Sequence, residues 1–114
     1  MISVTIERLP LNDHIRSFKV KGHAMFADPG QDIVCAGVSA VTVGTVNAIE
    51  TLLGFELQAQ MKDGFLQAEA PEGLDSLKQD KLQLLLESMV IMLQSIENTY
   101  GDYIQVKQSN GKRR

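Results

Sequence analysis

Cysteine and histidine are scarce in this chain, and their scarcity excludes two common kinds of site. Its 114 residues include two histidines and one cysteine, Cys35. A lone cysteine cannot form an internal disulfide. One cysteine with two well-separated histidines also falls short of the four ligands that a closed zinc site needs. We therefore expect the protein to work without a metal or any other cofactor.

Apolar segments that would direct the chain to a membrane are also missing. The opening residues, MISVTIERLP, alternate and carry charge where a secretory signal would need an apolar stretch. No apolar run is expected to approach the length of a membrane span. Since the thiol has no disulfide partner, these features favour a soluble, cytoplasmic protein without a membrane partner.

Basic side chains are few and unevenly placed. Eleven Lys and Arg stand against fourteen Asp and Glu, and the net charge is −3. Four of the eleven lie in the last eight residues, KQSNGKRR, which leaves a net charge of −7 on the remainder. Because so acidic a body should repel phosphate backbones, we expect no direct nucleic-acid binding. The basic end is interpreted as a solvated terminus.

The pattern of apolar residues predicts one α+β domain over residues 1–114. Alternating β-branched and polar residues indicate strands, and long apolar runs without proline indicate helices. Asp63 and Gly64 suit a tight hairpin turn, and Gly54 is typical of a helix end. The expected strands are 2–7, 15–22, 55–61, 65–70 and 103–108, and the expected helices are 32–53 and a long one after Ser76. Their order is ββαββαβ, a small sheet packed with two helices.

The second helix carries more apolar surface than one buried face requires. A single stripe along it holds Leu82, Leu85, Leu86, Met89, Leu93 and Ile96. Leu84, Ile91 and Met92 fall outside that stripe. So wide an apolar surface implies burial on two sides, either within the domain or against a second copy of the chain.

The stretch GHAMFADPGQDIVCAG, residues 22–37, brings the cysteine near a histidine. Asp32 is a preferred N-cap residue, so Cys35 becomes the third helical position, where unpaired N–H groups and the helix dipole favour a thiolate. The short preceding loop returns the helix start toward the strand end that carries His23. His14 sits at the opposite end of that strand. From spacing alone, a catalytic pair and an ordinary buried thiol beside a backbone-bonded histidine both stay open.

Three further residues have candidate supporting roles. Ser39 lies one helical turn after Cys35, where its hydroxyl could reach the surroundings of the sulfur or bond back to the Cys35 carbonyl. Gly22 lacks a Cβ and would let the substrate or the helix approach His23 closely. Asp32 is either the helix cap or the group that orients His23, and the cap is favoured by its position.

The motif GHA, followed by a variable loop and then DIVCAGVSAVTVGTVNAI, resembles the ribosomal-processing cysteine protease family Prp. The resemblance extends over nearly the whole chain and implies an α+β fold and a homodimer. It also implies that His23 and Cys35 form the catalytic pair and that Ser39 is a characteristic residue. The implied substrate is a large-subunit ribosomal protein precursor, whose short N-terminal extension is cut off after an aromatic residue.

The residues support nucleophilic acyl transfer, in which Cys35 attacks a scissile carbonyl and His23 moves the proton. The N–H groups of the first helical turn, including that of Cys35, are the expected oxyanion donors. Two other classes stay open. One is a noncatalytic ribosome-assembly adaptor whose basic end touches RNA. The other is a thiol redox sensor or peroxidase, which would need an external thiol because the chain has no resolving cysteine.

Overall fold

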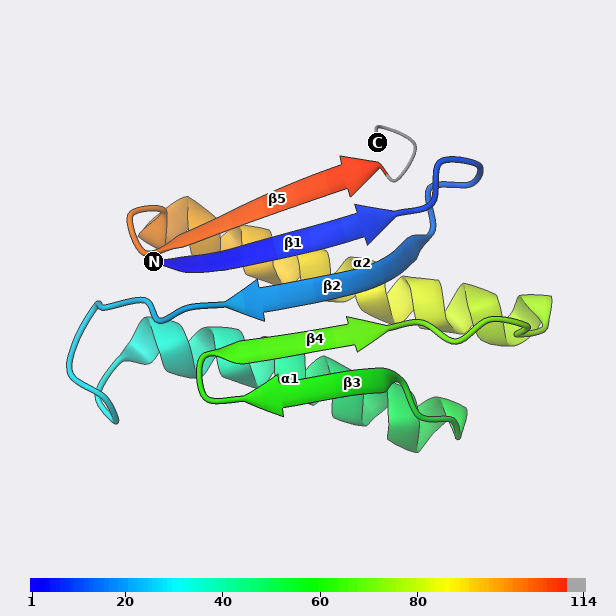
Figure 1. Cartoon of the computed structure of the whole chain (residues 1–114), viewed down its shortest axis with the longest axis horizontal. Helices are drawn as coiled ribbons and strands as arrows, with labels where there is room; N and C mark the ends of the chain where they lie inside the picture. Colours follow the sequence, from blue (N-terminus) through cyan, green and yellow to red (C-terminus); the bar gives the residue numbers. More distant parts are fainter. Residues whose placement is uncertain (111–114) are drawn as a thin grey trace.

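The seven elements follow one another in the predicted order. A computed structural model of the chain describes residues 1–110 and shows five strands and two helices (Figure 1). Their bounds are β1 Ile2–Arg8, β2 Ile15–Lys21, α1 Ile33–Leu53, β3 Gln58–Lys62, β4 Phe65–Glu69, α2 Ser76–Tyr100 and β5 Ile104–Asn110. The predicted ββαββαβ order and α+β class are therefore confirmed.

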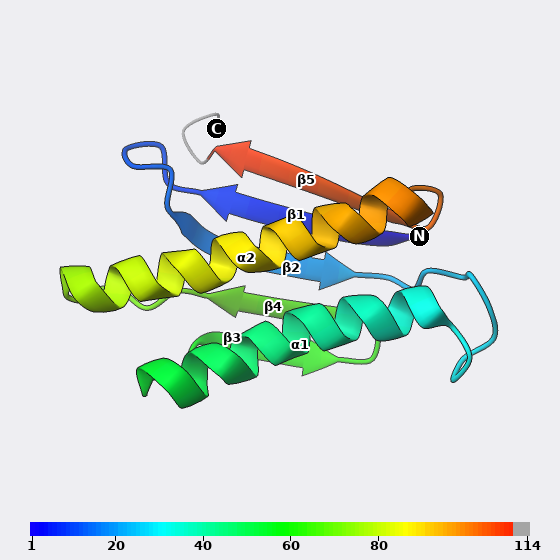
Figure 2. The same ribbon diagram turned by 180° about the vertical axis from the view of Figure 1, so that it is seen from behind.

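The five strands form one mixed sheet that is covered on one face by both helices. The strand order is β3-β4-β2-β1-β5, in which β5 runs parallel to β1 and every other neighbouring pair is antiparallel. Figure 2 shows α1 and α2 side by side over the same face. In β1, Ile2, Val4 and Ile6 alternate toward the helices and are almost completely buried. This alternation places the core between the sheet and the helix layer.

Helix α1 begins and ends where the sequence predicts. The side chain of Asp32 caps its first turn, and Gly54 ends it with a left-handed φ of 79°. Among the described residues this helix is long and apolar enough to cross a membrane, with a mean hydropathy of 1.6. The expectation that no apolar run reaches that length is thus wrong for 33–53. The composition also suits a core helix, since Val34, Val38 and Ile49 are buried.

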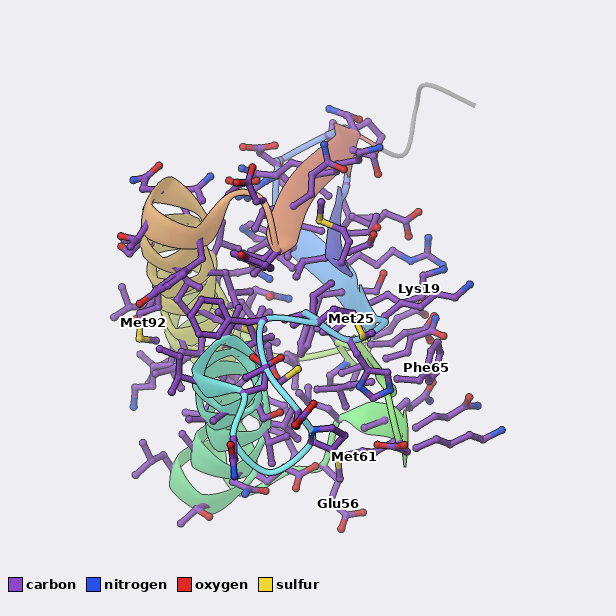
Figure 3. The ribbon with its side chains drawn as sticks, turned by 90° about the vertical axis from the view of Figure 1, so that its left-hand side faces the viewer. Lys19, Met25, Glu56, Met61, Phe65 and Met92 are labelled. Carbon is purple, nitrogen blue, oxygen red and sulfur yellow. The ribbon has the colours of Figure 1, made fainter. Side chains whose placement is uncertain are left out.

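Helix α2 buries the predicted stripe and exposes the apolar residues outside it. Leu82, Met89 and Leu93 are fully buried. Leu84 and Ile91, by contrast, are 71% and 61% exposed, and Met92 also lies outward. Figure 3 shows Met92 on the outer side of the helix layer, away from the sheet. Of the two explanations for this surface, burial within the domain is therefore excluded.

Two strand boundaries differ from the prediction by more than one residue, for identifiable reasons. Strand β3 starts at Gln58 and not at position 55, because Leu57 is buried and its N–H donates to the Glu50 carboxylate at 3.2 Å. Strand β5 continues to Asn110, in register with Arg8 of β1. Residues 107–110 of the basic end are therefore paired strand and not a solvated terminus. The rest of that end, residues 111–114, lies outside the described residues.

Candidate active site

Cys35 and His23 reach the same end of the molecule by the short route that the sequence suggests. Cys35 lies in the first turn of α1 and is partly exposed, and its sulfur accepts the backbone N–H of Ala24 at 3.3 Å. Ala24 directly follows His23, so the strand end and the helix start are in contact. Both side chains border the same two cavities, whereas His14 borders a different one.

The His23 ring lies against the turn between β3 and β4. The side chain is about half exposed, and its Nε2 is 4.0 Å from the Oδ2 of Asp63. A Cβ placed on Gly64 would come within 2.6 Å of Nε2, so the ring occupies space that only glycine leaves free. Within residues 1–110 no hydrogen bond joins His23 to Cys35. The ring therefore rests on the turn in this state.

Asp32 is a helix cap whose two oxygens serve different segments. Its Oδ1 accepts the N–H groups of Val34 and Cys35, both at 3.0 Å, and its Oδ2 accepts those of Phe26 and Ala27 at 2.9 and 3.3 Å. Desolvation by burial opposes the charge, but these four donors together hold the pKa of the Asp32 carboxyl below its ordinary value. With its acceptors engaged in this way, the carboxylate ties the loop to the helix and does not contact His23.

Two of the predicted oxyanion donors in the first turn of α1 are already engaged. The N–H groups of Val34 and Cys35 donate to Asp32, so the expectation that the Cys35 N–H is free is wrong. Ser39 is different. The residue is exposed and its hydroxyl makes no hydrogen bond within the described part of the chain, so of its two candidate roles the bond back to the Cys35 carbonyl is absent. Thr42 does bond back in this way, to the carbonyl of Val38.

Gly22 makes room for the chain start and also lines one of the two cavities that His23 borders. Its φ is +98°, and a Cβ there would lie 2.5 Å from the Met1 carbonyl oxygen. Its N–H donates to the Gly64 carbonyl at 2.8 Å. Gly22 thereby fixes the end of β2 against both β1 and the β3–β4 turn, which sets the position of the adjacent His23.

Two cavities meet at the candidate pair. The first, of about 200 Å³, lies between α1 and the β3–β4 hairpin, and its apolar lining includes Ile2, Val20, Val38, Val43, Met61 and Leu66. The second, of about 570 Å³, lies between the 24–31 loop and α1, and it is lined by Met25, Ala27 and Pro29 together with three carboxylates. His23, Cys35, Ser39 and Asp63 border both cavities. An extended peptide that crosses Cys35 could place one side chain in each cavity.

The acidic groups near the second cavity are not arranged as a metal site. They are Asp28, Asp32 and Asp63. Over residues 1–110 no group of three or more His, Cys, Asp or Glu side chains could hold a metal ion. The carboxylates instead give this cavity a negative rim.

Sequence reasoning missed two features that shape the site. Asp63 and Gly64 were interpreted only as turn residues, although their turn contacts His23. The 24–31 loop is held by Phe26, whose ring packs edge-on against Tyr100 and Tyr103 at centroid distances of 5.6 and 5.1 Å. The only local signal for the first feature was the Asp-Gly pair, which marks a turn without showing what lies beside it.

Comparisons with known proteins agree over nearly the whole chain. A family model described as cysteine protease Prp matches residues 1–105. The ribosomal processing cysteine protease Prp of Bacillus subtilis is 46% identical over 108 residues, which cover 93% of this chain and 96% of that protein.

Solved structures give the same result. The crystal structure of an essential ribosomal processing protease Prp from S. aureus, in complex with a covalently linked product peptide, matches with a TM-score of 0.86 and 32% identity. A structure of S. aureus Prp with a substrate peptide matches with a TM-score of 0.81 at the same identity. Each match covers 96% of this chain and 100% of the other. This chain therefore belongs to the cysteine protease Prp family.

Proposed function

We propose that this cysteine protease removes the N-terminal extension of a large-subunit ribosomal protein precursor, with Cys35 as nucleophile and His23 as its proton-transfer partner. The observation that carries the proposal is the contact of the Cys35 sulfur with the residue after His23, at the junction of two cavities. Relatives named ribosomal processing cysteine proteases, one of them solved with a substrate peptide, support the substrate class.

The reaction is acyl transfer through a thioester. The thiol proton of Cys35 passes to His23 as the sulfur attacks the scissile carbonyl, and the C–N bond breaks as His23 gives that proton to the leaving amine. His23 then accepts a proton from the water that attacks the thioester, the C–S bond breaks to release the acid product, and the proton returns from His23 to the Cys35 sulfur. The Ala24 N–H donates to the Cys35 sulfur at 3.3 Å and so holds the sulfur at the strand end that carries His23. Since catalytic hydrogen bonds often tighten only with substrate bound, the His23 ring closes on Cys35 in the complex.

Ser39 is the proposed donor to the oxyanion. Its exposed hydroxyl borders both cavities one helical turn beyond Cys35. The backbone N–H groups of Val34 and Cys35 at the helix start are bonded to Asp32. A hydroxyl without a competing partner is available to the tetrahedral intermediate when it forms.

The first cavity suits the residue on the acyl side of the cut. Six aliphatic side chains line it, and its volume of about 200 Å³ has room for one aromatic side chain. We assign it to the aromatic residue after which the extension is cut. The second cavity then receives the chain on the other side of the scissile bond.

The protein is further proposed to be a cytoplasmic homodimer without direct nucleic-acid contact. Leu84, Ile91 and Met92 form an exposed apolar group on the outer side of α2. A second copy of the chain covers this group in the proposed dimer.

A peptide that spans the extension junction tests the proposed function. Wild-type protein should cut it once, after the aromatic residue, and mass spectrometry should detect both fragments. Cys35→Ala and His23→Ala should leave it intact, whereas His14→Ala should cut it at the wild-type rate because His14 lies at the far end of β2. Equal cleavage by Cys35→Ala would overturn the assignment.

A further inference from the structure

We propose that Asp63 is a positioning residue for His23: its carboxylate holds the Nε2 side of the ring, which directs Nδ1 toward Cys35. The kinetic consequence of this proposal rests on the proposed function, whereas the structural relationship itself does not. Nε2 of His23 lies 4.0 Å from Oδ2 of Asp63. Both side chains border the two cavities that meet at Cys35.

The backbone fixes Asp63 beside His23 although the two are far apart in the sequence. Strand β4 pairs with β2, and Phe65 lies opposite Lys21 at the end of that ladder. One step further, the Gly22 N–H donates to the Gly64 carbonyl at 2.8 Å. The turn that carries Asp63 is therefore bonded to the strand end that carries His23.

Gly64 determines which ring nitrogen meets the turn. Its φ of +71° and its missing Cβ let the imidazole lie directly on the turn, with Nε2 nearest to it. A carboxylate on that side favours the tautomer that has its proton on Nε2. The lone pair of Nδ1 is then free to accept the proton of the Cys35 thiol. In this arrangement Nδ1 is therefore the nitrogen that must act as the base.

The other acidic groups near the site do not compete for this role. The Asp32 carboxylate accepts four backbone N–H groups of the loop and the helix. Asp28 borders the second cavity, but within residues 1–110 the carboxylate that lies within 4.0 Å of a His23 ring nitrogen is that of Asp63. The Asp63 side chain is 99% exposed, so its removal leaves no hole in the core and its variants should fold.

The test compares Asp63→Ala and Asp63→Asn with Asp80→Asn, which removes an equal charge from the exposed side of α2. With the junction peptide as substrate, Asp63→Ala should lower kcat about tenfold while KM changes little, because the carboxylate that orients the His23 ring is lost. Asp63→Asn keeps an acceptor and should recover part of that loss. Asp80→Asn should behave as wild type.

Nitrogen NMR of the neutral imidazoles reports which ring nitrogen carries the proton. This quantity would not change if Asp63 had only a structural role. In wild type the His23 proton should reside mainly on Nε2, and in Asp63→Ala this preference should disappear while His14 is unchanged. Because this readout needs no substrate, it judges the contact even if the junction peptide is not cleaved. An unchanged His23 tautomer and an unchanged kcat in Asp63→Ala would overturn the proposal.

Discussion

The sulfur of Cys35 lies 3.3 Å from the backbone nitrogen of Ala24, the residue that directly follows His23. This contact joins the end of β2 to the start of α1 across the 24–31 loop. The loop is held in turn by Asp32 and by the packing of Phe26 on Tyr100 and Tyr103. The site is thus built from a strand end and a helix start that the same loop connects.

The two oxygens of Asp32 predict different effects for two substitutions. Asp32→Ala loses all four acceptor contacts, so its melting temperature should fall by several degrees. Asp32→Asn keeps an oxygen for Val34 and Cys35 but turns an NH₂ group toward the N–H groups of Phe26 and Ala27. It should therefore melt between wild type and Asp32→Ala, with reduced cleavage because the loop loosens. Thermal melts and cleavage rates check both, and an Asn variant that matches wild type in both would contradict the loop-anchoring role.

The lowered pKa of Asp32 predicts a pH dependence of stability with a definite sign. Its carboxyl stays ionised to lower pH in the folded protein than in the unfolded chain, where the pKa is about 3.9. The stabilisation is therefore fully present above about pH 5 and is lost as the pH falls toward and below 4. Denaturant unfolding should show that wild type has a larger free energy of unfolding than Asp32→Ala, and that this difference becomes smaller as the pH falls from about 5 to below about 4. A gap of constant size from pH 6 to pH 3 would contradict the assignment.

Gly64→Ala should disable cleavage because the new methyl group would displace the His23 ring. Gly73→Ala is the matched control. Gly64 and Gly73 both have positive φ, at +71° and +80°, so alanine strains the backbone similarly at each. Only at position 64 would the new methyl group meet the His23 ring, whereas nothing lies within 4 Å at position 73. Both variants should lose similar stability, but Gly64→Ala alone should lose most of kcat. Equal activities in the two variants would show that the ring does not depend on the turn.

Sedimentation should find a dimer that a single charge on α2 weakens. Ile91→Lys places an ammonium group in the exposed apolar group and should raise the dimer dissociation constant at least tenfold. Leu11→Lys is the control, because Leu11 is also apolar and 94% exposed but lies in the turn between β1 and β2 and not on α2. Wild-type protein that sediments as a monomer at every concentration would reject the dimer.

The local pattern of apolar and polar residues predicted the helices and strands, because this pattern depends on residues that are close together in the sequence. The cap at Asp32, the end at Gly54 and the buried stripe of α2 all follow from residues within a few positions of one another. The start of β3 did not follow, because it depends on a bond between Leu57 and a carboxylate seven residues upstream. The prediction also ended strand β5 two residues too early, because the last residues of this strand are fixed by pairing with β1.

The candidate site was predictable only where its parts are close in sequence. His23, Asp32 and Cys35 lie on one strand–loop–helix segment, so their approach needed no knowledge of the sheet. The contact of Asp63 with His23 depends on β4 lying next to β2, which strand patterns alone do not specify. The sequence left two arrangements open for the Ser39 hydroxyl, because a helical serine commonly bonds back to the preceding turn.

The central claim, that Cys35 attacks the scissile carbonyl, is tested most directly by acid-quenched intact-mass spectrometry of the enzyme mixed with the junction peptide. The account predicts a transient adduct with the mass of the acyl fragment, mapped to Cys35 by digestion under conditions that preserve the thioester. The adduct should be absent in Cys35→Ala and should form much more slowly in His23→Ala, while His14→Ala should form it as wild type does. Cleavage by Cys35→Ala at the wild-type rate, or an adduct that maps to another residue, would contradict the account.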